Sequence, residues 1–109
     1  MSVVADTGAA AFSFEPTGPA RFAVGGAMTF ATARLLHEAG LRALNGSTVT
    51  ELELDCAGVT VADSAGLAVL VDWLAWARRA GRSLRLHDIP TKLLDLARIS
   101  ELDALLAPA

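Results

Sequence analysis

Hydrophobic and polar positions repeat along this chain with two periods, one typical of strands and the other typical of helices. Alternation with a period of two predicts strands at residues 11–15, 21–24, 49–54 and 83–86. Apolar residues at helical spacing predict helices at about residues 29–44, 64–80, 91–99 and 101–106. Strands that alternate with helices imply right-handed crossovers and a mostly parallel sheet, so the pattern predicts an α/β fold.

Local signals set the expected ends of these elements. Gly25-Gly26 is expected to end the second strand, and residues 58–62 are expected to form a loop. Thr29 and Asp63 have the side chains preferred at helix N-caps, so they are expected to begin the first and second helices. The side of the first helix expected to be buried carries Phe30, Ala33, His37, Leu41 and Leu44.

The second helix has apolar residues on two nearly opposite sides. With about 100° between successive residues, one side carries Leu67, Leu70, Val71 and Leu74, which is the natural core face. The other side carries Val69, Trp73, Trp76 and Ala80. If the helix lies on a sheet, this second side forms either an exposed patch suited to a partner or a surface covered by a neighbouring helix.

The composition fits a single globular domain over residues 11–109, preceded by a small, polar and flexible leader at residues 1–10. The chain is 53% hydrophobic and 19% charged, which argues against disorder. A net charge of −3 and a pI near 5.2 leave no basic footprint for nucleic acid or anionic lipid.

Nothing in the sequence predicts export or membrane insertion. The lone Cys56 permits no internal disulfide, which fits a reducing cytoplasm. The first residues lack the pattern of a signal peptide. The longest apolar stretch, Ala65–Ala77, is too short to span a bilayer and contains Asp72. We therefore expect a cytoplasmic protein.

The segment from Leu52 to Leu70 carries the most informative motif. A strand ending at Asp55 is followed by a loop and then by Asp63-Ser64-Ala65-Gly66-Leu67. This strand-Asp and Asp-Ser-x-Gly-Leu pattern, with the element order over residues 11–106, resembles the STAS family of anti-sigma-factor antagonists and anion-transporter tails. The resemblance implies a mixed sheet of four to five strands with helices packed mainly on one face.

The motif differs from that of the antagonists at one position. Antagonists carry a phosphorylated hydroxyl residue directly before the glycine, whereas this chain has Ala65 there. Asp-Ser-Ala-Gly-Leu instead resembles the MlaB-type STAS subunits of Mla phospholipid transporters, which act in outer-membrane lipid asymmetry. That resemblance implies a functional role for Ser64 and binding to the transporter's cytoplasmic ATPase, hence peripheral association with the inner membrane. The expected partner-binding residues are Asp63, Ser64, Ala65, Gly66, Trp73 and Trp76.

Other interpretations of the same residues stay open. The protein is alternatively an antagonist that binds an anti-sigma kinase, with Ser64 as a phosphorylation site, or a sensor that binds a nucleotide or anion at the helix start. In the plainest interpretation, Asp63 and Ser64 are only caps and Gly66 is incidental. No catalytic residue, cofactor or metal site is expected. His37 and His87 have no neighbouring ligand in the sequence, and no nucleophile accompanies the carboxylates of Asp55 and Asp63.

Overall fold

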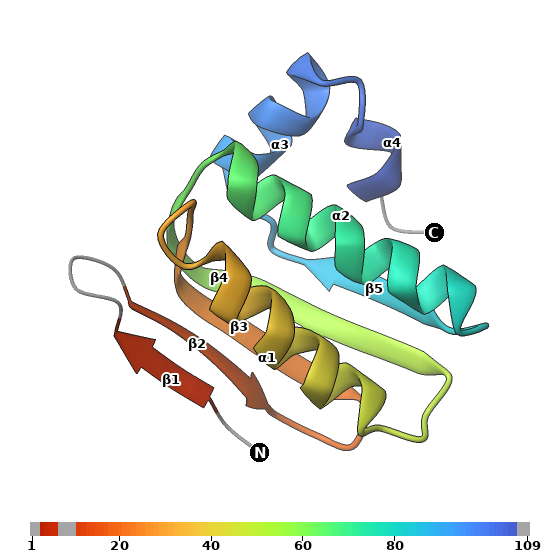
Figure 1. The fold of residues 1–109 in the computed structure, drawn as a ribbon. Helices are drawn as coiled ribbons and strands as arrows, with labels where there is room; N and C mark the ends of the chain where they lie inside the picture. The colour runs from red at the N-terminus through yellow and green to blue at the C-terminus, as the bar shows by residue number, and fades with distance from the viewer. Residues whose placement is uncertain (1–2, 7–10, 107–109) are drawn as a thin grey trace.

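The computed structural model describes residues 3–6 and 11–106. The elements follow in the order β1 (Val3–Asp6), β2 (Ala11–Pro16), β3 (Arg21–Met28), α1 (Ala33–Asn45), β4 (Glu51–Ala62), α2 (Ser64–Arg79), β5 (Ser83–His87), α3 (Thr91–Ile99) and α4 (Asp103–Leu106). Figure 1 shows α1 and α2 lying across one face of the sheet, with α3 and α4 beside α2 on the side away from α1. The predicted α/β fold with helices mainly on one face is confirmed.

The sheet has five strands in the order β1-β2-β3-β4-β5. The first three strands pair antiparallel, and β3-β4 and β4-β5 pair parallel across the crossovers through α1 and α2. Val3–Asp6, which fall within the expected leader, form a strand that pairs with the edge of β2. Residues 1–2 and 7–10 of that leader lie outside the described residues.

The core lies between the sheet and the helices, and the strands alternate accordingly. In β4 the side chains of Leu52, Leu54 and Cys56 are buried, whereas the alternate residues Glu51 and Asp55 are exposed. Phe12 and Phe14 in β2 and Leu84 and Leu86 in β5 add to the same buried face. One face of the sheet is therefore apolar and covered, and the other carries polar and charged side chains.

Two strands are longer than their sequences predict. β3 continues through Gly25-Gly26 to Met28, and β4 includes the expected loop at residues 58–62. Gly26 has a φ of 78°, and a Cβ there would overlap the main chain of Ala11 on β2. The glycines therefore permit a register shift within the strand and do not end it. The paired extension of β3 and β4 supplies the hydrogen bonds that neither segment has alone.

Helix α1 begins later than expected and buries a different side. It starts at Ala33 with Thr32 at the N-cap position, where Thr29 was expected. The buried Thr32 hydroxyl donates to the carbonyl of Ala27 at 2.8 Å and accepts from the amide of Thr29 at 3.0 Å. These bonds hold residues 29–32 in turns, so Phe30 lies before the helix and is 86% exposed. The residues that α1 buries are Leu36, Ala39, Gly40 and Leu44.

The remaining helices follow the predicted pattern. α2 ends one residue before its expected end, α3 spans the expected residues 91–99, and α4 is shorter than expected, at Asp103–Leu106. Within the described part of the chain, no helix combines the length and apolar character needed to cross a bilayer.

Candidate docking site at the start of α2

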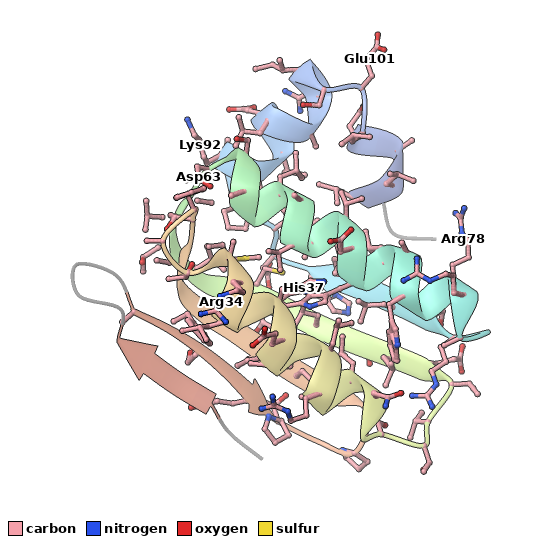
Figure 2. All side chains as sticks on the ribbon, viewed as in Figure 1. Arg34, His37, Asp63, Arg78, Lys92 and Glu101 are labelled. Carbon is pink, nitrogen blue, oxygen red and sulfur yellow. The ribbon has the colours of Figure 1, made fainter. Side chains whose placement is uncertain are left out.

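Asp63 links the start of α2 to the loop before α1. One carboxylate oxygen, Oδ1, accepts hydrogen bonds from the amides of Ala65 and Gly66 at 2.9 and 3.2 Å, which confirms the predicted N-cap. The other oxygen, Oδ2, accepts from the amide of Phe30 at 3.0 Å. Figure 2 shows Asp63 at the end of the molecule where α2 and α3 begin. The carboxylate therefore fixes the position of two segments that are distant in sequence.

Gly66 allows α2 to approach the end of β3 closely. Gly66 is buried, and a Cβ at this position would overlap the carbonyl group and side chain of Met28. The amide of Asp63 also donates to the carbonyl of Met28 at 3.2 Å. The space that glycine leaves is filled by the protein's own main chain. Gly66 therefore positions the helix start, and its contact with a partner stays a prediction.

The residues around this cap leave an exposed surface that contains both apolar and hydroxyl groups. Ser64 is exposed and Ala65 is half-buried at the first turn of α2. Phe30, which is 86% exposed, is held beside them because its main-chain amide donates a hydrogen bond to the Asp63 carboxylate. Here Phe30, Ser64 and Ala65 are called the α2-start surface. Val61, at the same carboxyl end of the β3–β4 pair, is 53% exposed.

Phe30 does not stand out as a site residue in the sequence, because helical spacing places it on the side of the first helix expected to be buried. The turns at residues 29–32 remove it from that helix. They depend on the bond from Thr32 to Ala27 on β3, which no local pattern of apolar residues reveals. The signal in the sequence was the presence of two threonines, Thr29 and Thr32, either of which could act as an N-cap.

The two tryptophans of α2 have different environments. Trp73 is fully buried, its ring centroid is 5.3 Å from that of Phe14, and its indole nitrogen donates to the carbonyl of His37 at 3.3 Å. Of the two alternatives for this side of α2, Trp73 therefore follows the one in which a neighbouring helix covers the surface, because α1 lies over it. Trp76 is half-buried under the guanidinium of Arg82, which is 5.5 Å from the ring centroid. It lies roughly 18 Å along α2 from Ser64, too far to join the α2-start surface.

Comparison with known proteins gives the family. A family model described as "Mlab, STAS domain" matches residues 15–107. This chain belongs to the MlaB-type STAS domain family. The solved structure of the anti-sigma factor antagonist SpoIIAA in its unphosphorylated form is similar, with a TM-score of 0.67 and 13% identity over 90% of this chain and 87% of that chain. At this identity the similarity shows a shared fold. No curated protein sequence matches the chain.

The electrostatics of this STAS domain disfavour a free anion at the helix start. The Asp63 carboxylate already uses two of the amides that α2 leaves unpaired, and its negative charge repels a second anion. Asp55 and Asp63 do not form a carboxylate pair, since the seven extended residues 56–62 of β4 separate them by roughly 25 Å. The Asp55 carboxylate instead accepts a hydrogen bond from the amide of Ala57 at 2.8 Å.

The histidines and the cysteine, whose side chains could take part in chemistry, have structural surroundings. Nε2 of His37 lies 3.5 Å from Oδ2 of Asp72 and joins α1 to α2, and Nε2 of His87 lies 2.7 Å from Oε1 of Glu53. Burial raises the pKa of the Cys56 thiol to about 12, so this thiol is protonated at neutral pH. In residues 3–6 and 11–106, no His, Cys, Asp or Glu side chains gather in a group of three that could hold a metal ion.

Proposed function

We propose that this protein is a non-catalytic subunit that binds the cytoplasmic ATPase of an Mla-type phospholipid ABC transporter. It would support the assembly or activity of that transporter in outer-membrane lipid asymmetry, and it would be cytoplasmic and held at the inner membrane through the complex. The single observation that carries the proposal is the exposed Ser64 in an Asp-Ser-Ala-Gly-Leu motif whose aspartate and glycine serve the fold.

The roles of the motif residues separate under this proposal. Asp63 and Gly66 hold α2 against the loop before α1 and against β3, so they present the surface without touching the partner. Ser64 and Ala65 supply a small, flat contact at the first turn. Phe30 is the natural anchor, because covering an exposed phenylalanine contributes about 1.5–3 kcal/mol. A partner with an apolar pocket beside a hydrogen-bonding group would fit this arrangement.

The proposal is tested by co-purification with the transporter ATPase. Ser64→Glu is expected to abolish co-purification, since an unpaired charge buried in the interface costs about 3 kcal/mol or more. The melting temperature should change little, because a negative charge is tolerated at a helix N-terminus. Phe30→Ala is expected to weaken binding without loss of stability.

Thr48→Glu is the matched control, since Thr48 is exposed in the loop between α1 and β4, at the other end of the sheet. This variant should bind like the wild type. Normal co-purification of both Ser64→Glu and Phe30→Ala would overturn the α2-start surface as the contact.

A second candidate, partner switching with an anti-sigma kinase, is favoured by the exposed hydroxyl of Ser64 at a helix N-terminus. A phosphate there would meet the positive end of the helix dipole, although the Asp63 carboxylate opposes it. Ala65 weighs against this candidate, because the position that resembles the antagonists' phosphorylation site has no hydroxyl. Mass spectrometry of protein from cells decides: stoichiometric phosphate on Ser64 that changes partner binding would favour switching over the transporter.

A further inference from the structure

A second surface lies at the opposite edge of the helical layer, far from the start of α2. A groove of about 750 Å³ runs between α2, β5 and α4. β5 is an edge strand of the sheet, so the groove follows a sheet edge that no described strand covers. Leu105 of α4 is 43% exposed beside the groove. The apolar lining comes from Val71, Leu74, Leu84, Leu86, Leu105 and Leu106.

Arginines are concentrated around this groove. The chain has a net charge of −3, yet four of its nine lysines and arginines line this groove. They are Arg78, Arg79, Arg82 and Arg85. Arg82 is engaged within the fold, since its guanidinium donates to the carbonyls of Leu44 and Ser47 at 3.2 and 2.7 Å.

The other three arginines, Arg78, Arg79 and Arg85, form no ion pair with any described residue. Figure 2 shows Arg78 extending away from the end of α2. The helix dipole accounts for cations at Arg78 and Arg79, but it does not account for Arg85, which lies on β5.

The main chain of β5 presents hydrogen-bonding groups to the groove side. The amide of Ser83 donates to the carbonyl of Thr50 at 2.9 Å, and β4 and β5 pair in register from Ser83 onward. Because main-chain groups alternate along a strand, those of Leu84 and Leu86 point away from β4 toward the free edge. In the part of the chain that the structure describes, no strand pairs with that edge. The edge is therefore open to a further strand.

We propose that this groove binds an extended acidic segment of a partner protein, which pairs with β5 as an added strand. The main chain of β5 supplies the pairing, and the apolar lining accepts alternate side chains of the segment. The carboxylates between them lie on the other face of the sheet, where Arg85 projects, and Arg78 and Arg79 at the end of α2 attract the acidic segment at the start of β5. A second copy of the chain fits poorly, because antiparallel pairing centred on Arg85 would bring two arginines together. This inference does not rest on the function proposed for the α2-start surface.

The experiment uses the full chain and a short fluorescent peptide in which glutamate alternates with valine. Anisotropy titration is expected to show binding that weakens as salt rises. The double variant Arg78→Glu, Arg79→Glu and the single variant Arg85→Glu should each lose about tenfold or more in affinity. Arg34→Glu is the matched control, since Arg34 is exposed on α1 away from the groove, and it should bind normally. Ser64→Glu should also bind normally, which separates this test from that of the proposed function.

Two further peptides test the mode of binding. A peptide with lysine in place of glutamate is expected not to bind, and N-methylation of alternate amides in the glutamate peptide should abolish binding by removing the ladder bonds. Hydrogen exchange should show new protection of the Leu84 and Leu86 amides in the complex.

Failure of the glutamate peptide to bind would overturn the proposal, as would equal binding by the lysine or N-methylated peptide, or unchanged binding by Arg85→Glu. Arginine-dependent binding to phosphatidylglycerol vesicles without peptide binding, or arginine-dependent dimerisation, would also overturn it in favour of a lipid or a second copy.

Discussion

At the scale of single residues, the start of α2 depends on a missing side chain. Gly66 lets the helix pack directly against the carbonyl of Met28. That contact fixes the position of Ser64 relative to the sheet. A glycine in the first turn makes the helix less stable, by on the order of 1 kcal/mol relative to alanine. The close approach to β3 offsets that cost, since the same geometry allows the bond from Asp63 to Met28.

Gly66→Ala is expected to destabilise the protein by about 1–3 kcal/mol, because the added methyl overlaps main chain that cannot move without disturbing β3. Gly46→Ala is the control: Gly46 has a φ of −72° and room for a Cβ, so the change should stay within about 0.5 kcal/mol. Urea denaturation of both variants measures the difference. A Gly66→Ala protein as stable as wild type would show that the contact is not tight.

Cys56 offers a second test at this scale. Because burial raises the pKa of its thiol to about 12, native protein should react with a thiol reagent at neutral pH far more slowly than protein unfolded in guanidinium. The rate of colour development with a disulfide reagent measures both. Equal rates in the native and unfolded protein would contradict burial of Cys56 in solution.

At the scale of elements, the contact between α1 and α2 determines which side of α2 is available. The Trp73 indole fills the space above Gly40 of α1, where a Cβ would overlap its ring. The indole nitrogen of Trp73 also donates a hydrogen bond to the main-chain carbonyl of His37, and the imidazole of His37 faces Asp72 on α2. An aromatic ring on the inside and a polar pair on the outside thus join the two helices. On the second apolar side of α2, Val69 and Trp73 belong to the core, whereas Trp76 is half-buried.

The two tryptophans should respond differently to truncation. Trp73→Ala is expected to cost about 3–5 kcal/mol of stability, the range for a buried aromatic residue in a core. Trp76→Ala should cost clearly less, because Trp76 is half-buried and contacts an arginine at the surface. Thermal and urea unfolding of the two variants measures this contrast. If Trp76→Ala proved the more damaging, the assignment of Trp73 to the core would be contradicted.

At the scale of the whole molecule, the sheet separates a covered apolar face from an open polar face. On the open face Glu53 of β4 contacts Arg21 of β3 at 3.2 Å and His87 of β5 at 2.7 Å, so one carboxylate joins three strands. The hydrogen bond from His87, with the charge and hydrogen bond of Arg21, lowers the pKa of Glu53 below its ordinary value of 4.5.

This lowered pKa predicts a pH-dependent contribution. Because the pKa of Glu53 is lower in the folded protein, its carboxylate stabilises the fold fully at pH values above the ordinary pKa of 4.5. This stabilisation is lost as the pH falls through the pKa that Glu53 has in the folded protein. Wild type should therefore melt above Glu53→Gln near neutral pH, and the gap should close below pH 4.5. Glu51→Gln, at an exposed position on the same strand, should show no such gap. A gap that widens in acid would contradict the assigned role of Glu53.

The sequence by itself determined the features that depend on neighbouring residues. Asp63 was identified as a cap because its partners, Ala65 and Gly66, lie within three residues. The bounds of α3 and the alternating faces of β4 and β5 likewise follow from local spacing. The motif from Asp63 to Leu67 also indicated the family, which the match over residues 15–107 bears out.

Only the tertiary structure decided the features that depend on distant residues. The segment at residues 58–62 is a strand because β3 pairs with it, and Thr32 replaced Thr29 as the cap position because its hydroxyl reaches Ala27. Trp73 is buried because α1 carries Gly40 opposite it, and periodicity within α2 contains no information about that helix. Phe30 is exposed for the same physical reason: hydrogen bonds and packing between segments far apart in the chain outweighed local preference.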